Sequence, residues 1–250
     1  MHSSTRVGPR RRMFRAVLAT AAAAATAAGL LAGASPANAA TTVKGMDVSH
    51  YQGTVNWSSN YSKGARFAYI KATESTSYTD PQFNRNYTAS RSAGFIRGAY
   101  HFARPASSSG ATQAKYFSNH GGGWSADGKT LPPALDMEYN PSGSTCYGLS
   151  HASMVSWIKS FSNYMHTRWH KYPMIYTTFD WWNTCTGNSS AFAKTNPFWI
   201  ARYSSSQPSA PAGTATWTIW QYASSGTFAG DQDKFNGSMT RLKALAKNRD

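Results

Sequence analysis

Acidic residues are scarce in this chain. Its 250 residues contain 10 Asp and Glu against 25 Lys and Arg, which gives a formal net charge of +15. A protein this basic is attracted to polyanions. Beyond residue 40, however, the basic side chains are scattered and form no basic helix or compact cluster of the kind that binds nucleic acid. We therefore expect no nucleic-acid partner.

Cysteine is also rare, with Cys146 and Cys185 as the two thiols of the chain. No histidine stands near them at ligand spacing, which argues against a zinc site, and we expect neither a metal nor another cofactor. In an exported protein the pair is expected to form a disulfide. It would close a loop of about 40 residues and stabilise the fold by about 4 kcal/mol.

Long apolar runs are missing after residue 40, which excludes a membrane segment of the usual kind there. The one such run, residues 16–34, follows a basic segment without acids and precedes the A-x-A pattern of Ala37, Asn38 and Ala39. This arrangement predicts a secretory signal peptide over residues 1–39. The pair Arg11–Arg12, followed by Met and Phe, also resembles a twin-arginine export signal. The mature protein would be secreted, extracellular and free of the membrane.

Internal repeats and Ser- or Pro-rich linkers are absent as well, so residues 40–250 are predicted to form one domain. Short apolar runs of strand length alternate with helical or loop segments. The predicted strands are 42–49, 65–73, 95–103, 131–139, 173–178, 197–202 and 215–222. The predicted helices are 82–93, with Asp80 as N-cap and Pro81 at N1, then 111–120, 150–170 and 238–249.

This alternation indicates an α/β fold with a parallel sheet. The last strands follow one another too closely for full helices between them. We therefore predict an irregular, TIM-like β/α barrel in which some helices are missing in the C-terminal half.

Polar residues recur where the predicted strands end: Asp47, Glu74, His101, Asp136, Glu138, Tyr176, Arg202 and Gln221. The active site of a β/α barrel lies at the C-terminal ends of its strands. Packing alone would not place polar residues at the same end of successive strands. The pattern therefore predicts a catalytic groove at that end.

Asp136 and Glu138 are the most informative pair. Residues two apart on a strand share a face, roughly 6.5–7 Å apart, so both acids point into one space and Met137 points away. Neighbouring carboxylates push their pKa values apart. We expect an ionised Asp136 to raise the pKa of Glu138, and Asp47 to stay ionised. An acid beside an anion is what glycoside hydrolysis requires.

The motifs around these residues follow a recognisable order. They are DVSHYQG from Asp47, YIKATE from Tyr69 followed by Tyr78 and Asp80, GAYHFARP from Gly98, ALDMEYN from Ala134, PMIYTT from Pro173, WIARY from Trp199, IWQY from Ile219 and DQDKFNGS from Asp231. In this order they resemble glycoside hydrolase family 25, a family of lysozymes. The family has glycine after the glutamate of its signature, where this chain has Ser75.

The resemblance implies a modified β/α barrel that hydrolyses the β-1,4 bond between N-acetylmuramic acid and N-acetylglucosamine in peptidoglycan. Residue by residue, it implies that Glu138 is the general acid and that Asp136 orients the acetamido group or stabilises an intermediate. Asp47 would be the third catalytic carboxylate. The partners would be peptidoglycan and anionic cell-wall polymers, and we expect a monomer.

Substrate contacts are expected from a further set of residues: Glu74, Tyr100, Tyr139, Tyr176, Arg202, Gln221 and Asp231. We favour a structural or positioning role for Glu74, because Lys71 is close enough to pair with it. Trp181 and Trp182 are expected at the rim of the groove. Trp199 and Trp220 either contact sugars or pack the barrel wall.

Two other functions remain open. Chitinases of another barrel family also use an Asp-x-Glu strand end, but they have a further acid two residues before that Asp, where this chain has Ala134. A catalytically inactive lectin that binds cell wall or chitin on the same barrel is the second alternative. An inactive protein would be expected to have lost one of its buried acids, since such groups are costly to keep.

Overall fold

The structure is a computed structural model that describes residues 41–250. The predicted signal peptide, its cleavage pattern and the twin-arginine-like sequence lie outside these residues. Among the described helices, none has the length and apolar character that crossing a membrane requires.

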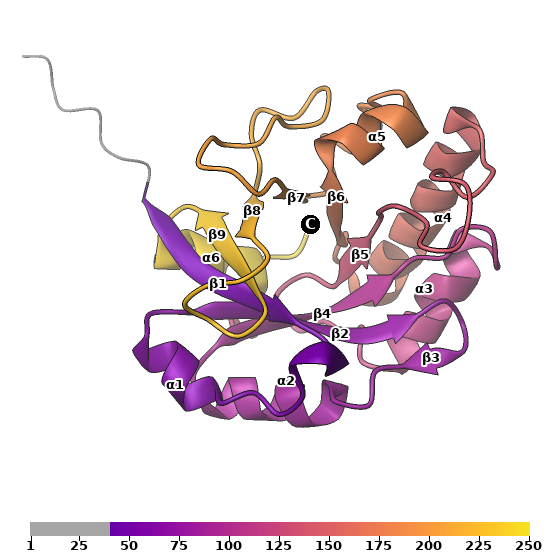
Figure 1. Ribbon diagram of the computed structural model, residues 1–250. Helices are drawn as coiled ribbons and strands as arrows, with labels where there is room; N and C mark the ends of the chain where they lie inside the picture. The colour runs from indigo at the N-terminus through magenta and orange to yellow at the C-terminus, as the bar shows by residue number, and fades with distance from the viewer. Residues whose placement is uncertain (1–40) are drawn as a thin grey trace, which may run out of the picture. The chain divides into compact units, whose positions relative to one another are not determined.

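The core of the fold is a closed barrel of eight strands (Figure 1). They are β1 (Thr42–Val48), β2 (Phe67–Glu74), β4 (Ile96–Phe102), β5 (Ala134–Asp136), β6 (Met174–Thr178), β7 (Phe198–Ala201), β8 (Ile219–Ala223) and β9 (Asp231–Asn236). Neighbours from β1 to β8 pair in parallel, and β9 closes the barrel by pairing antiparallel with both β8 and β1. A short β3 (Tyr78–Thr79) forms a hairpin with β2.

The predicted irregular barrel is thereby confirmed, and the seven predicted strands are present. The predicted fourth strand is shorter than expected, because β5 covers only Ala134–Asp136. The closing strand β9 was not predicted as a strand. Its sequence DQDKFN has no apolar run. It also follows β8 without an intervening helix, so it does not fit the alternation of strands and helices on which the prediction was based.

The helices surround the barrel (Figure 1). They are η1 (His50–Gln52), α1 (Trp57–Ser62), α2 (Phe83–Ser92), α3 (Gly110–Asn119), α4 (His151–Trp169), α5 (Phe179–Thr186) and α6 (Met239–Lys247). The four predicted helices correspond to α2, α3, α4 and α6. No helix of the described chain lies between β7 and β8 or between β8 and β9, so the predicted loss of helices in the C-terminal half is also confirmed.

Serine caps explain where three of these helices begin. The side chains of Ser109, Ser150 and Ser238 each accept a hydrogen bond from the backbone N–H three residues later. The predicted cap of α2 was wrong, since its N-cap is Gln82. Asp80 still accepts the backbone N–H of Gln82 at Oδ1 (2.9 Å). It is also buried against His50, whose backbone N–H and ring Nδ1 lie 2.9 and 3.0 Å from Asp80 Oδ2.

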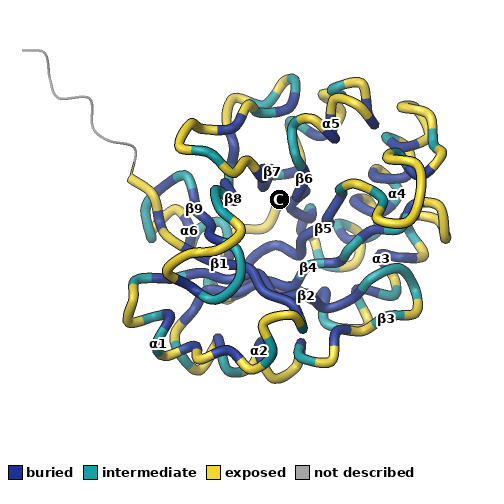
Figure 2. Tube along the Cα trace, in the orientation of Figure 1, coloured by how far each residue is buried: buried dark blue, intermediate teal, exposed yellow. Residues whose placement is uncertain are grey.

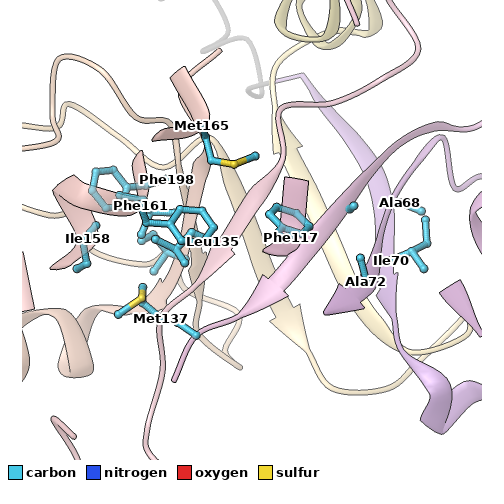
Figure 3. Packing of buried hydrophobic residues seen from close by; sticks show 14 of the residues in the cluster. Ala68, Ile70, Ala72, Phe117, Leu135, Met137, Ile158, Phe161, Met165 and Phe198 are labelled. Atoms are coloured by element: carbon cyan, nitrogen blue, oxygen red, sulfur yellow. The ribbon is translucent and has the colours of Figure 1, made fainter. Parts of the chain in front are cut away.

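Alternate residues of each strand face opposite sides, and this sets the layers of the molecule. The outward side chains of the strands pack against the helices, as Leu135 and Met137 do against Ile158 and Phe161 of α4 (Figure 3). The inward side chains form a second cluster inside the barrel, which includes Tyr69 and Trp199. Both faces are covered, so the strands are buried while the surrounding loops are exposed (Figure 2).

Cys146 and Cys185 form the predicted disulfide, with their Cα atoms 5.2 Å apart. Cys146 lies in the loop after β5, and Cys185 lies on α5 rather than in a loop. Neighbouring Trp181 and Trp182 were expected at the rim of a groove, but both are 0% exposed. The helix turns them into the core, where Trp181 Nε1 donates to the carbonyl of Thr145 at 3.3 Å.

We expect reduction of this disulfide to lower the free energy of unfolding by a few kcal/mol or less, because the loop it closes regains freedom mainly in the unfolded chain. Thermal melts with and without reductant would measure the change. The double variant Cys146→Ser, Cys185→Ser is the control, and its melting temperature should not respond to reductant. Two free thiols found by titration of the denatured, unreduced protein would contradict the bridge.

Candidate active site

Five of the chain's ten acidic residues meet at one end of the barrel: Asp47, Asp136, Glu138, Asp231 and Asp233. On β1 and β5 the acids stand at the C-terminal end of a parallel strand. Because β9 runs the other way, its first residue, Asp231, lies at the same end and is paired in register with Asp47. These positions share the inward parity of their strands, so their side chains enter one space.

Two adjoining cavities open between these acids. The inner one, about 90 Å³, is lined by Asp47, Tyr100, Asp136, Glu138, Tyr176, Trp199, Gln221 and Asp231. The outer one, about 260 Å³, shares the acids and Tyr100 and extends to Ser49, Tyr51, Gln52, Lys71 and Phe102. A larger hollow of about 670 Å³ lies between the segment Pro105–Gly110 and α4. It has no ionisable side chain in its lining, so we place the chemistry at the acids.

Asp136 and Glu138 both line the inner cavity, whereas Met137 is fully buried among the helices, as the two-residue spacing predicted. The backbone N–H of Met137 donates to the carbonyl of Tyr176 at 2.9 Å, which extends the β5–β6 pairing past the end of β5. This contact keeps the backbone extended past the end of β5, so the side chains continue to alternate between inward and outward up to Glu138. Asp136 is 6% exposed and its Oδ1 accepts no hydrogen bond from the described residues.

Asp47 is held by a chain of neutral hydrogen-bond donors. Its Oδ2 accepts a hydrogen bond from Gln221 Nε2 at 2.7 Å. The amide of Gln221 is oriented from its other side, because Tyr176 and Tyr203 both donate their hydroxyls to Oε1, at 2.9 and 3.0 Å. Three strands, β1, β6 and β8, therefore fix the direction of the Asp47 carboxyl group.

The expectation that Asp47 is permanently ionised is wrong. Burial, followed by the charge of Asp231, raises the pKa of Asp47 to about 8, although its hydrogen bonds act in the opposite direction. The sequence showed no cation near Asp47, but it did not show that another acid would face it across β1 and β9. Burial also raises the pKa of Asp231 to about 6.

The pKa values of Asp136 and Glu138 also differ from the expected ones. Burial raises the pKa of Glu138 to about 7, with a contribution from Asp231, while Lys71 acts to lower it. The pKa of Asp136 is raised well above its usual value, by burial and then by the charge of Glu138. Asp136 is thus not the anion that raises the pKa of Glu138. The cluster keeps protons at neutral pH mainly because its carboxyls are buried together.

Four of the polar residues predicted for the site lie outside both cavity linings: Glu74, Arg202, His101 and Tyr139, whose hydroxyl donates to Asp180 Oδ2 at 2.6 Å. The Glu74 carboxylate accepts hydrogen bonds from Lys71 Nζ at 2.7 Å and from Arg104 Nε at 2.8 Å, which confirms the predicted pairing with Lys71. Arg202 is exposed and donates from Nη1 to the carbonyl of Gln207 at 2.8 Å. His101 is 0% exposed and faces away from the barrel interior, toward Gln113 of α3.

Tyrosines form the exposed aromatic edge that Trp181 and Trp182 were expected to supply. In the part of the chain that the structure describes, the exposed large apolar side chains are Tyr51, Tyr139 and Tyr203. They follow β1, β5 and β7, so all three stand at the end of the barrel that carries the acids. Trp220 is 4% exposed and packs on the outer side of the barrel wall. Trp199, 2% exposed, lies inside the barrel and lines the inner cavity.

Asp233 was missed by the sequence reasoning. It lies two residues after Asp231 on β9 and faces inward one layer deeper in the barrel. The spacing that identified Asp136 and Glu138 recurs here, and it would have identified this pair had the segment been recognised as a strand. Within residues 41–250, no three His, Cys, Asp or Glu side chains converge in a way that would hold a metal ion.

A family model for glycosyl hydrolases family 25 matches residues 46–231, which include four of the five clustered acids. The chain belongs to glycosyl hydrolase family 25. It is therefore a glycoside hydrolase. The cluster of acids at the carboxyl ends of the strands supplies the carboxyl groups that glycoside hydrolysis requires.

Individual relatives extend across nearly the whole described barrel. The chain is 54% identical over 211 residues to lysozyme M1 of Streptomyces globisporus, covering 82% of this chain and 72% of the relative. It is 51% identical over 209 residues to an N,O-diacetylmuramidase of Chalaropsis sp., covering 82% and 99%. The solved structure of a family 25 lysozyme from Aspergillus fumigatus superposes with a TM-score of 0.82 at 54% identity, covering 83% and 100%.

Proposed function

We propose that this protein is a secreted N-acetylmuramidase, which hydrolyses the β-1,4 bond between N-acetylmuramic acid and N-acetylglucosamine in bacterial peptidoglycan. The observation that carries the proposal is the convergence of Asp47, Asp136 and Glu138 on one cavity at the carboxyl ends of the strands. The kinship with proteins named lysozyme and N,O-diacetylmuramidase supports muramic acid as the sugar on one side of the bond.

Glu138 is the general acid of the proposed reaction. It is less buried than Asp136, and its raised pKa of about 7 keeps a proton available near neutrality. It lines both cavities, so the proton can be transferred to the oxygen of a sugar bound in the groove. The protonated glycosidic oxygen stays on the leaving sugar as a hydroxyl group.

Asp136 and Asp47 act on the sugar whose bond is broken. Asp136 lines the inner cavity and is more buried than Glu138, and we assign it to orienting the acetamido group of the substrate. Asp47 approaches from β1 and stabilises the positive charge that develops on the ring, or positions the attacking water. Tyr100, Tyr176, Gln221 and Asp231 line the same space. Tyr139 directly follows Glu138 and is exposed, with its hydroxyl donated to Asp180.

Glu74 and Arg202 have weaker claims to substrate contact. Both lie outside the cavity linings, and their charged groups are engaged with Arg104 and Lys71 or with a loop carbonyl. We assign Glu74 a positioning role: it holds Lys71, which lines the outer cavity and affects the pKa of both acids on β5.

Fragment analysis tests this function directly. Purified peptidoglycan would be digested with the protein, and the products would be reduced and identified by mass spectrometry. A muramic acid at the new reducing end is the expected result. A glucosamine there, or cleavage of chitin oligomers instead, would favour the chitinase-like alternative. Wall binding without any cleavage would favour the lectin.

The export signal predicted for residues 1–39 supports an extracellular location. Five of the 25 basic residues lie in that segment (Arg6, Arg10, Arg11, Arg12 and Arg15). Twenty basic against ten acidic side chains would remain, a net charge of +10. Such a charge attracts anionic wall polymers from a distance, before any sugar contacts the catalytic groove.

Lysis of intact walls should therefore fall with added salt more strongly than hydrolysis of a short, neutral oligosaccharide. Salt screens charges that are more than about 10 Å apart at 0.1 M ionic strength, but it does little to the chemistry inside a buried cluster. The two rates would be measured across one salt series. An equal decline on both substrates would contradict the electrostatic contribution.

A further inference from the structure

Asp233 lies beneath the groove, lines neither cavity and has no part in the proposed reaction. Its side chain is 0% exposed. Gly45 of β1 and Gln221 of β8 stand opposite it in register. Gly45 has no side chain, so the inward-facing side chain of β1 next to Asp233 is that of Asp47, two residues further along the strand.

Only one of the two oxygens of Asp233 has a conventional donor. Its Oδ1 accepts a hydrogen bond from Trp199 Nε1 at 2.9 Å. Its Oδ2 is buried and receives no hydrogen bond from the described residues. A buried acceptor without a donor is costly, whereas a protonated carboxyl oxygen needs an acceptor in place of a donor.

That acceptor is present. Asp47 is the inward-facing acid of β1 two residues from the position opposite Asp233, so its carboxyl group is the neighbouring acceptor. Two carboxyl groups can share a hydrogen bond only when one of them carries a proton. Asp47 already accepts a hydrogen bond from Gln221, and it borders the open cavity. Asp233 also accepts one hydrogen bond, from Trp199, but it is fully buried and lines neither cavity, so the proton belongs to Asp233.

We propose that Asp233 is a positioning residue that stays protonated while the enzyme works, and that it donates its proton in a hydrogen bond to Asp47, which fixes the Asp47 carboxylate toward the groove. The inference rests on the catalytic role proposed above for Asp47.

The surroundings of Asp233 favour the neutral form. The acids that face it are Asp47 on β1 and Asp231 on β9. Tyr69 of β2 lies inside the barrel and Tyr203 follows β7, whereas Tyr222 of β8 packs on the outer side of the barrel. Burial, then the charge of Asp47, raises the pKa of Asp233 well above its usual value, and the hydrogen bond from Trp199 offsets this in part. None of these groups is a cation.

This arrangement gives Asp47 two neutral donors, Gln221 and Asp233, in place of a salt bridge. A cation at this position would stabilise the anion but would also cancel the charge that the reaction needs. Neutral donors hold the carboxylate and leave its charge available to a positively charged sugar ring. The hydrogen bond from Asp233 also lowers the pKa of Asp47, against the effect of burial.

The matched variants Asp233→Asn and Asp233→Leu test the proposal in the intact protein. Asparagine keeps an acceptor for Trp199 and an N–H donor for Asp47, and it cannot ionise. Leucine is similar in size and offers neither. The Asn variant should keep kcat within about threefold of wild type, whereas Leu should lower kcat by roughly 10- to 100-fold with little change in KM.

The pH profile separates positioning from simple structural damage. Without the donor at position 233, the pKa of Asp47 rises further above that of Glu138. The alkaline limb of kcat/KM, which follows the higher of the two pKa values, should therefore move to higher pH in the Leu variant and stay in place in the Asn variant. A Leu variant that is as active as the Asn variant, with an unchanged profile, would overturn the proposal.

A second measurement does not depend on activity or on the folding of the Leu variant. The carboxyl carbons of aspartate would be labelled with ¹³C and followed by NMR in the wild-type protein, with the Asn variant assigning the signal of Asp233. That signal should keep the shift of a protonated carboxyl from about pH 5 to about pH 8. An ionised Asp233 at neutral pH would overturn the inference, even if peptidoglycan cleavage is established; a protonated Asp233 would support it, even if the substrate proves to be a different glycan.

Discussion

Replacing Glu138 by glutamine is expected to lower the rate of wall hydrolysis by about 10²–10⁴-fold. Glutamine keeps the size and polarity of the side chain but has no proton to give to the leaving oxygen. Sugar binding should survive, because the walls of both cavities are unchanged. Clearing of a cell-wall suspension and hydrolysis of a soluble oligosaccharide would measure the loss, and binding to insoluble wall would measure what remains.

Glu74→Gln is the matched control, since the chain contains only these two glutamates. It makes the same chemical change in an acid that lies outside both cavity linings, where the carboxylate holds Lys71 and Arg104. We expect a loss of about tenfold or less. If the Glu138→Gln variant cleared walls at near wild-type speed, Glu138 would not be the proton donor.

Thermal stability gives an independent check on the same variant. The pKa of Glu138 is raised to about 7 in the folded protein, against about 4.3 in an unfolded chain. The folded state therefore binds more protons between these values, and wild-type stability falls as the pH rises through them. Glu138→Gln removes this loss, so it should melt higher than wild type at pH 8 and nearly equally at pH 4. If the variant and the wild type had the same melting temperature at pH 8 as well as at pH 4, the raised pKa of Glu138 would be contradicted.

The parts of the site that could be predicted from the sequence depend on strand periodicity. Asp136 and Glu138 stand at the end of an apolar run, so their spacing alone placed both on the inward face and Met137 on the outward one. The same alternation explains why Tyr176 and Gln221 enter the groove. Local patterns were sufficient wherever the strand itself was visible as an apolar run.

The parts that could not be predicted depend on pairing between distant segments. Asp233 and the raised pKa of Asp47 both result from β9, which is polar in sequence and becomes a buried strand only because it closes the barrel between β8 and β1. Trp181 and Trp182 were placed at a rim because their segment looks like a loop. It forms α5 instead, and the turn of that helix directs both indoles into the core.

Asp47→Asn is expected to lower kcat by roughly 10²–10³-fold, for a different reason from Glu138→Gln. Asparagine can still accept the hydrogen bond from Gln221, so the groove should keep its shape. It cannot carry the negative charge that stabilises a positively charged sugar ring. The matched control is Asp127→Asn, which makes the same change in a loop before β5, where the carboxylate accepts the backbone N–H groups of Lys129 and Thr130. That variant should lose stability rather than activity.

The pH profile of the Asp47→Asn variant distinguishes the two acids. Wild type needs Asp47 ionised and Glu138 protonated, and their pKa values of about 8 and about 7 put both limbs of the profile close to neutrality. Without Asp47, the acidic limb should flatten, because no carboxyl at that position has to lose a proton. Because the group that must be ionised has the higher pKa, the wild-type alkaline limb lies near pH 8, and in the variant it should move down to the pKa of Glu138, whose proton is still required. An Asp47→Asn variant that remained highly active at neutral pH but lost its alkaline limb would show that Asp47 is the proton donor, and the roles of Asp47 and Glu138 would then have to be exchanged.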